Sequence, residues 1–310
     1  MKLNVIYMGT PEFSVKPLDE ISKQCNVLLV VTQPDKSVGR KQEIKFPPVK
    51  EYAIEHDIPV FQPVKIREDY QRIMNLKPDL IITCAYGQII PKELLELPKY
   101  GCINIHASLL PKYRGGAPIH HSIINGDEYT GVTIMYMDEK MDSGDILYQE
   151  KIKIEDTDNV GTMFEKLSVL GSNMIRDFIP KIVNNDFTRI KQNEDEVTYA
   201  YNISKEDEKI DFNNSSKDIF NKIRGLNPFP VGYALLEGKR VKLYSSRIGN
   251  KNIGSIGEII GIYDDGIGIR TSDSEIIITE LQFEGKKRTT TKEYLNGIQD
   301  KNCLLGKKFE

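Results

Sequence analysis

Short runs of apolar and β-branched residues alternate with segments of helical spacing along residues 1–190. Strands are expected where such a run is short and ends in turn residues, at residues 3–7, 27–32, 80–84, 102–105 and 131–137. Apolar residues recur with helical spacing at residues 13–23, 49–55, 68–76 and 161–183. Because strands that alternate with helices form parallel sheets, the pattern predicts an α/β fold with a mostly parallel sheet that helices cover.

The pattern changes after a polar and charged stretch at residues 189–208. One helix is expected at residues 218–224, and short strands follow at residues 233–236, 240–247, 257–263, 266–271 and 275–283. Such closely spaced strands are typical of a small β-barrel. We therefore predict a Rossmann-like α/β domain at residues 1–190, a linker at residues 191–207 and a small β-barrel domain at residues 208–310.

The composition indicates two cores and unpaired thiols. A chain of 310 residues with 39% hydrophobic residues is long enough to bury two cores. Residues 3–8 have the pattern of a strand, and no run of about 18 apolar residues occurs, so we expect a cytoplasmic protein that does not enter a membrane. The four cysteines lie far apart and lack the spacing of a metal site, which favours free buried thiols.

An amide, an imidazole and a carboxylate form a candidate catalytic trio. Asn104 and His106 stand two positions apart at the end of an expected strand, so their side chains point to the same side of the sheet. Open α/β sheets place their functional sites at this end of the strands. Asp142 lies in a turn-rich loop after the next expected strand and completes the trio.

The remaining histidines and the first glycine turn suggest neither a metal nor a nicotinamide cofactor. His56, His120 and His121 do not have the spacing of metal ligands, so no metal is expected. Gly9 follows the first expected strand, as in dinucleotide-binding domains. The Gly-x-Gly-x-x-Gly pattern is missing there, however, which argues against NAD.

Basic residues gather in the segment 36–50, although the formal net charge of the chain is only −3. The segment holds five basic residues and one acidic residue. It follows an expected strand, at the edge where parallel sheets expose their loops. The cluster predicts a contact with a polyanion, and ordinary solvated loop charge is the alternative interpretation.

Two sequence runs carry a family resemblance. They read Asn-x-His-x-Ser-Leu-Leu-Pro-x-Tyr-Arg-Gly at residues 104–115 and Met-Asp-x-x-x-Asp-x-Gly-Asp at residues 137–145. This combination resembles the formyltetrahydrofolate-dependent formyltransferases. Further runs at residues 8–13, 32–36 and 224–230 are similar to the members of that family that act on initiator tRNA. The resemblance extends over nearly the whole chain, and it implies a C-terminal barrel of the oligonucleotide-binding type.

The resemblance implies that Asn104, His106 and Asp142 are the catalytic residues. In formyl transfer an amine attacks a formamide carbonyl, so an oxyanion must be stabilised and a proton must move. Asn104 and His106 can each donate an N–H group to the oxyanion. Asp142 can hold the imidazole in one tautomer or take the amine proton through water.

The resemblance also implies where the formyl donor, 10-formyltetrahydrofolate, is bound. The segment matching the donor site consists of Ser108, Leu109, Leu110 and Pro111. A second wall of the pterin pocket is expected at Tyr86 and Gly87, although a buried strand end would show the same sequence.

The basic segment matches an insertion that contacts the acceptor end of initiator tRNA in the related enzymes. The expected tRNA-binding residues are Lys36, Arg40, Lys41 and Lys45, with Arg40 at the principal arginine of the insertion. Phosphate contacts of this kind supply affinity, while a loop that reaches into a groove or separates weak end pairs supplies selectivity.

These expectations describe a monomeric enzyme that transfers a formyl group from 10-formyltetrahydrofolate to the α-amino group of methionine on initiator tRNA. The main alternative is a formyltransferase that acts on a nucleotide-linked amino sugar, which would share the trio but need not carry the basic segment. A purine-pathway formyltransferase would account for about two-thirds of the chain as a single folate domain. A non-catalytic RNA-binding protein would explain the barrel and the basic segment but would not require the trio.

Overall fold

The computed structural model describes residues 2–39 and 42–310, which form two compact units. Unit 1 consists of Met1–Pro118, Tyr129–Lys153 and Phe164–Tyr201. Unit 2 consists of Ile119–Glu128, Ile154–Met163 and Asn202–Glu310. The segment expected to be the linker therefore contributes residues 191–201 to unit 1 and residues 202–207 to unit 2.

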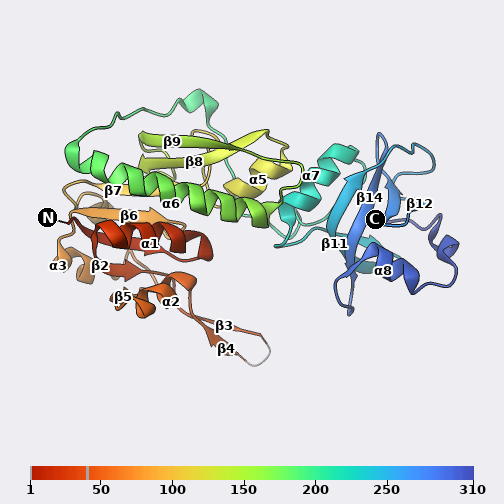
Figure 1. Cartoon of the computed structure of the whole chain (residues 1–310), viewed down its shortest axis with the longest axis horizontal. Coiled ribbons are helices and arrows are strands. Elements are labelled where there is room, and N and C mark those ends of the chain that lie inside the picture. Colours follow the sequence, from red (N-terminus) through yellow and green to blue (C-terminus); the bar gives the residue numbers. More distant parts are fainter. Residues whose placement is uncertain (1, 40–41) are drawn as a thin grey trace. The chain divides into compact units, whose positions relative to one another are not determined.

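A seven-stranded sheet forms the centre of unit 1 (Figure 1). Its strands lie in the order β5 (Val60–Phe61), β2 (Asn26–Val31), β1 (Asn4–Gly9), β6 (Leu80–Cys84), β7 (Cys102–His106), β8 (Tyr129–Tyr136) and β9 (Ile146–Lys153). Neighbouring strands from β5 to β7 run parallel, whereas β8 and β9 pair in antiparallel fashion. Every residue of β6 is buried, which explains why this strand is a continuous apolar run in the sequence.

Helices cover both faces of this sheet. They are η1 (Glu12–Ser14), α1 (Val15–Gln24), α2 (Pro48–Glu55), α3 (Gln71–Leu76), α4 (Lys92–Leu95) and α6 (Val160–Asn184). On one face, Met8 of β1 belongs to an apolar cluster with Ile73 of α3 and Leu94 of α4. On the other face, α6 approaches β7 closely, since a Cβ atom on Gly171 would lie 3.1 Å from Ile105. The sheet is thus the middle of three layers.

A small hairpin and a 3-10 turn complete unit 1. Strands β3 (Lys36–Val38) and β4 (Glu43–Lys45) form a separate two-stranded antiparallel sheet, which projects from the layered core in Figure 1. The turn η2 (Glu194–Glu196) follows α6. The basic segment is therefore partly a hairpin, which the sequence pattern did not predict.

Unit 2 is built around a curled antiparallel sheet. Its main strands lie in the order β10 (Tyr233–Leu236), β11 (Lys239–Ile248), β14 (Glu275–Phe283), β13 (Ile267–Arg270) and β12 (Ile259–Ile262), and β15 (Thr289–Thr290) pairs with β14. The helices are α5 (Pro118–Ile124), α7 (Ser216–Leu226), α8 (Thr291–Asn296) and η3 (Lys301–Leu304). The last residues connect both edges of the sheet, because Phe309 bridges to Leu236 while Lys308 bridges to Glu258.

The predicted fold class is confirmed: a mostly parallel α/β sheet precedes a small, barrel-like antiparallel sheet. None of the helices that the structure describes is both long enough and apolar enough to cross a membrane.

The run at residues 224–230 begins with an arginine that acts as a structural connector in unit 2. Arg224 at the end of α7 is only 9% exposed. Its guanidinium donates hydrogen bonds to the carbonyl oxygens of Glu155 and Asp158, at 2.9 and 3.2 Å, and to Asn221 Oδ1. Burial lowers the pKa of Arg224, but the arginine stays charged at neutral pH because its ordinary value is so high. These bonds tie α7 to the segment 154–163.

We expect Arg224→Gln to destabilise the protein by about 1–3 kcal/mol, because buried carbonyl groups would lose their donors. The measurement is the urea midpoint followed by circular dichroism. Lys239→Gln, at an exposed position of the same unit, is the matched control and should leave the midpoint unchanged. Equal midpoints for the two variants would contradict the structural role of Arg224.

Candidate active site

The carboxyl end of β7 places Asn104 and His106 on one face of the sheet. Oδ1 of Asn104 accepts a hydrogen bond of 2.8 Å from the hydroxyl of Thr83, its register partner on β6. Since Oδ1 has this donor, the amide is oriented and its NH2 group is left as the donor of the side chain.

The imidazole of His106 is hydrogen-bonded at one ring nitrogen and faces a carboxylate with the other. Its side chain is 6% exposed, and Nε2 lies 3.0 Å from the carbonyl oxygen of Tyr113. Because a carbonyl can only accept, Nε2 carries the hydrogen of this bond. Nδ1 lies 3.7 Å from Oδ2 of Asp142, which is an ion-pair distance and longer than a hydrogen bond. The Nδ1 edge therefore faces the carboxylate.

Asp142 reaches this position from a tight loop between β8 and β9. Its backbone has φ of 51°, in the left-handed region that residues other than glycine seldom adopt. Oδ2 accepts a hydrogen bond of 2.8 Å from the main-chain N–H of Gly115. The structure thus brings His106 and Asp142 together, while Asn104 stands beside His106 on the same strand end.

The segment 108–111, expected to contact the formyl donor, is fixed by polar side chains of β8 and β9. The hydroxyl of Thr133 donates to the carbonyl of Ser108 at 2.6 Å and accepts from the N–H of Leu110 at 3.2 Å. Gln149 donates to the carbonyl of Leu110 at 3.0 Å. Leu110 is buried, whereas Leu109 is partly exposed and available to a ligand.

The structure places the ring of Tyr86 in the core and leaves the backbone of Gly87 at the surface. The side chain of Tyr86 belongs to the apolar cluster beneath the sheet and is 4% exposed. Its carbonyl accepts a hydrogen bond of 3.0 Å from Gln33 Nε2. Gly87 is exposed and has φ of 85°. A ligand at this wall would therefore meet the main chain of Gly87 and not the phenol.

The hairpin presents two of the four residues expected to bind tRNA. Lys36 and Lys45 are exposed and directly opposite in the antiparallel register, so their side chains lie on the same face of the hairpin. Arg40 and Lys41 lie outside the described residues. The side chain of Lys50, by contrast, forms an ion pair of 2.6 Å with Asp35 within the fold.

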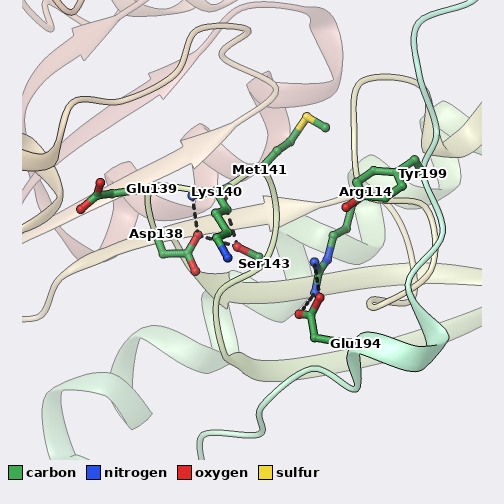
Figure 2. Close-up of a pocket in the computed structure, with 8 residues that line it drawn as sticks. All are labelled: Arg114, Asp138, Glu139, Lys140, Met141, Ser143, Glu194 and Tyr199. Atoms are coloured by element: carbon green, nitrogen blue, oxygen red, sulfur yellow. Dashed lines mark hydrogen bonds and ion pairs between the residues drawn. The ribbon is translucent and has the colours of Figure 1, made fainter.

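An open cavity of about 830 Å³ flanks the loop that carries Asp142 (Figure 2). Its lining consists of Arg114, Asp138, Glu139, Lys140, Met141, Ser143, Glu194 and Tyr199. Charges of both signs line it, and the Arg114 guanidinium holds the pKa of the Glu194 carboxyl below its usual range by hydrogen bonding. Within the part of the chain that the structure describes, no three His, Cys, Asp or Glu side chains gather in a group that could hold a metal ion.

Two residues that contact the candidate trio, Thr83 and Gln192, were not predicted from the sequence. Thr83 is the polar residue of the buried strand β6, and a polar position in an apolar run could have indicated a specific partner. Gln192 donates to the main-chain oxygens of Asp142 and Gly144, both at 2.8 Å. Its position in a polar stretch gave no comparable signal.

Comparison with known proteins assigns the family. Residues 1–179 match the family model described as formyl transferase, and residues 202–299 match the model of the formyl transferase C-terminal domain. The chain belongs to the formyl transferase family, as the two runs at residues 104–115 and 137–145 predicted.

Among its relatives are proteins named methionyl-tRNA formyltransferase. The one from Geobacillus sp. (strain WCH70) is 50% identical over 300 residues, which cover 95% of this chain and 94% of that protein. The one from Staphylococcus aureus (strain MW2) is 46% identical over 309 residues, which cover 98% of this chain and 99% of that protein.

Solved structures share the fold at lower identity. An N-formyltransferase from Helicobacter canadensis, in complex with folinic acid and dTDP-3-aminofucose, superposes with a TM-score of 0.68 and 22% identity, covering 93% of this chain and all of that one. HypX from Aquifex aeolicus in complex with tetrahydrofolic acid gives a TM-score of 0.65 and 16% identity, covering 95% of this chain and 47% of that one.

We expect Thr83→Val to lower kcat for formyl transfer about tenfold, or about 1.4 kcal/mol, because the Asn104 amide loses the donor that orients it. Thr83→Ser keeps a hydroxyl and should retain most of the activity. Steady-state kinetics of the two variants provide the measurement.

Thr32→Val is the matched control for this test. Thr32 is buried like Thr83, and its hydroxyl has no hydrogen-bond partner among the residues that the structure describes. The control variant should have normal kcat. Full activity of Thr83→Val would show that the orientation of Asn104 does not depend on this hydrogen bond.

Proposed function

We propose that this chain transfers the formyl group of 10-formyltetrahydrofolate to the α-amino group of methionine on initiator tRNA. The observation that carries the proposal is the similarity along nearly the whole chain to relatives named methionyl-tRNA formyltransferase, at 46–50% identity. We further propose that the protein serves translation initiation and acts in the cytoplasm, as a monomer and without a metal.

The catalytic part of the proposal uses Asn104, His106 and Asp142. The methionyl amine attacks the formyl carbon, a new C–N bond forms, and the carbonyl oxygen becomes an oxyanion. The NH2 group of Asn104 then donates to this oxygen, because its Oδ1 is engaged by Thr83. A single donor of this kind is typically worth about 3 kcal/mol in the transition state.

His106 and Asp142 complete the reaction by moving the proton. Asp142 takes the proton that the attacking amine loses, directly or through water, and Nδ1 of His106 faces the same space as the acceptor nitrogen of the ring, because Nε2 carries the hydrogen that is donated to Tyr113. The bond between the formyl carbon and the folate nitrogen then breaks, and the folate nitrogen leaves with a proton. General acid–base help of this type contributes about 10² to 10⁴ in rate.

We assign the two binding surfaces to different parts of the chain. The donor site is composed of Ser108, Leu109, Leu110 and Pro111 with the main chain at Tyr86 and Gly87. Residues 1–190 form the catalytic domain in this proposal, residues 191–207 connect it, and residues 208–310 add surface for tRNA. Lys36 and Lys45 on the hairpin contact tRNA phosphates together with Arg40 and Lys41, and the exposure of the two described lysines supports this role.

Incubation of the pure protein with formyl-labelled 10-formyltetrahydrofolate and methionyl-tRNA should place the label on methionine. An amino-sugar nucleotide, offered separately, should stay unlabelled. His106→Ala and Asn104→Ala should lower the single-turnover rate by at least about a hundredfold while the folded spectra persist. Label in the amino sugar alone would replace the proposed acceptor by the alternative one.

We expect the double variant Lys36→Ala/Lys45→Ala to bind methionyl-tRNA with a shallower salt dependence. The slope of log affinity against log salt concentration should fall by about one unit for each phosphate that the variant no longer neutralises. Affinity for the folate donor should not change. Arg67→Ala removes an exposed charge elsewhere in unit 1 and serves as the control. A slope equal to that of the control would exclude the hairpin lysines from the tRNA surface.

A further inference from the structure

The segment 190–200, which we call the strap, runs back along the active-site loops of unit 1. At its beginning, Ile190 and Ile146 of β9 exchange two main-chain hydrogen bonds of 2.9 and 2.8 Å. At its end, Ala200 donates to the carbonyl of Arg114 at 2.8 Å and accepts from Ala117 at 3.0 Å. The strap is therefore attached both to the strand that follows the Asp142 loop and to the segment that contains Gly115.

Between these attachments, the side chain of Gln192 contacts the Asp142 loop directly. Nε2 donates to the carbonyl oxygens of Asp142 and Gly144, both at 2.8 Å. Oε1 accepts a hydrogen bond of 3.0 Å from Nε of Arg114. A glutamine amide has two N–H donors and one carbonyl, so each polar atom of this side chain is used at the active-site loops.

Arg114 in turn is held in one orientation. Its side chain is 4% exposed, and its terminal nitrogens donate to both carboxylate oxygens of Glu194, at 2.9 and 3.4 Å. Figure 2 shows this pair at the wall of the cavity beside the Asp142 loop. A guanidinium fixed by a two-point contact presents Nε to Gln192 in a defined direction.

The Asp142 loop needs such support because of its backbone conformation. Asp142 has φ of 51°, and in this conformation its carboxylate accepts the Gly115 N–H and faces the Nδ1 edge of His106. A residue other than glycine keeps such a left-handed backbone conformation only where the surrounding structure fixes it. The hydrogen bonds that Gln192 donates to the carbonyls of residues 142 and 144 fix this loop directly.

We propose that Gln192 is a positioning residue for Asp142. The strap is then part of the active site and not only a linker between the two units. This inference rests on the proposed function only in taking Asp142 as catalytic. Gln192 contacts no reacting group, so its effect passes through Asp142. The alternative is that the strap only stabilises the fold, and the two possibilities predict different kinetics.

The test is a double-mutant cycle in the full chain with Gln192→Met, which keeps the length of the side chain but removes its hydrogen bonds. Gln192→Met should lower the single-turnover rate constant at least about tenfold, because small misplacements of catalytic groups slow the reaction strongly. In steady-state measurements it should leave KM for the folate donor within about twofold. In the background of Asp142→Asn, the same substitution should have little further effect. Gln24→Met removes a side-chain hydrogen bond to a carbonyl elsewhere in unit 1 and should be neutral.

Equal losses in both backgrounds would overturn the inference, and so would unchanged activity or an unfolded Gln192→Met variant. Glu194→Gln supplies a second measurement, because Glu194 is 73% exposed and its substitution should not unfold the protein. It should lower the single-turnover rate constant by a smaller factor than Gln192→Met, again only when Asp142 is present. If the wild-type protein does not formylate methionyl-tRNA, the proposed function fails, whereas the cycle can still be measured with the acceptor that is formylated.

Discussion

One oxygen atom, Oδ2 of Asp142, joins the segments of the candidate active site in unit 1. It accepts the N–H of Gly115 at 2.8 Å and lies 3.7 Å from Nδ1 of His106. The end of β7, the turn at residues 113–115 and the loop between β8 and β9 therefore meet at a single carboxylate. A carboxylate can accept several hydrogen bonds at once, so it can order separate segments without further polar groups.

Glycines at two positions allow the segments to approach so closely. A Cβ atom on Gly115 would lie 2.6 Å from the carbonyl oxygen of Ala200, and one on Gly144 would lie 1.9 Å from the carbonyl oxygen of Tyr136. Any other residue would therefore push the strap or β8 away. The glycines in the two runs that indicated the family thus have a packing reason that is independent of ligand contact.

The sequence predicted those parts of the fold that depend on local pattern. Strands such as β6 are buried on both faces and have apolar sequences, whereas β9 alternates partly buried and exposed residues after its first two positions and was not predicted. The positions of Asn104 and His106 followed from strand alternation. The partners of Thr83 and Gln192 could not be predicted, because they lie 21 and 50 residues away and depend on sheet register and on the path of the strap.

The arginine of the run at residues 224–230 has a structural role inside unit 2. The run is similar to the members of the family that act on initiator tRNA, yet its arginine donates to carbonyl oxygens inside unit 2. Similarity of a run to relatives therefore does not by itself show that its residues contact a substrate. Asn104 differs in kind, because Thr83 engages its oxygen and leaves its N–H groups as donors. The partners of each side chain, and not membership in a motif, separate the residues that build the fold from those that are able to act on a substrate.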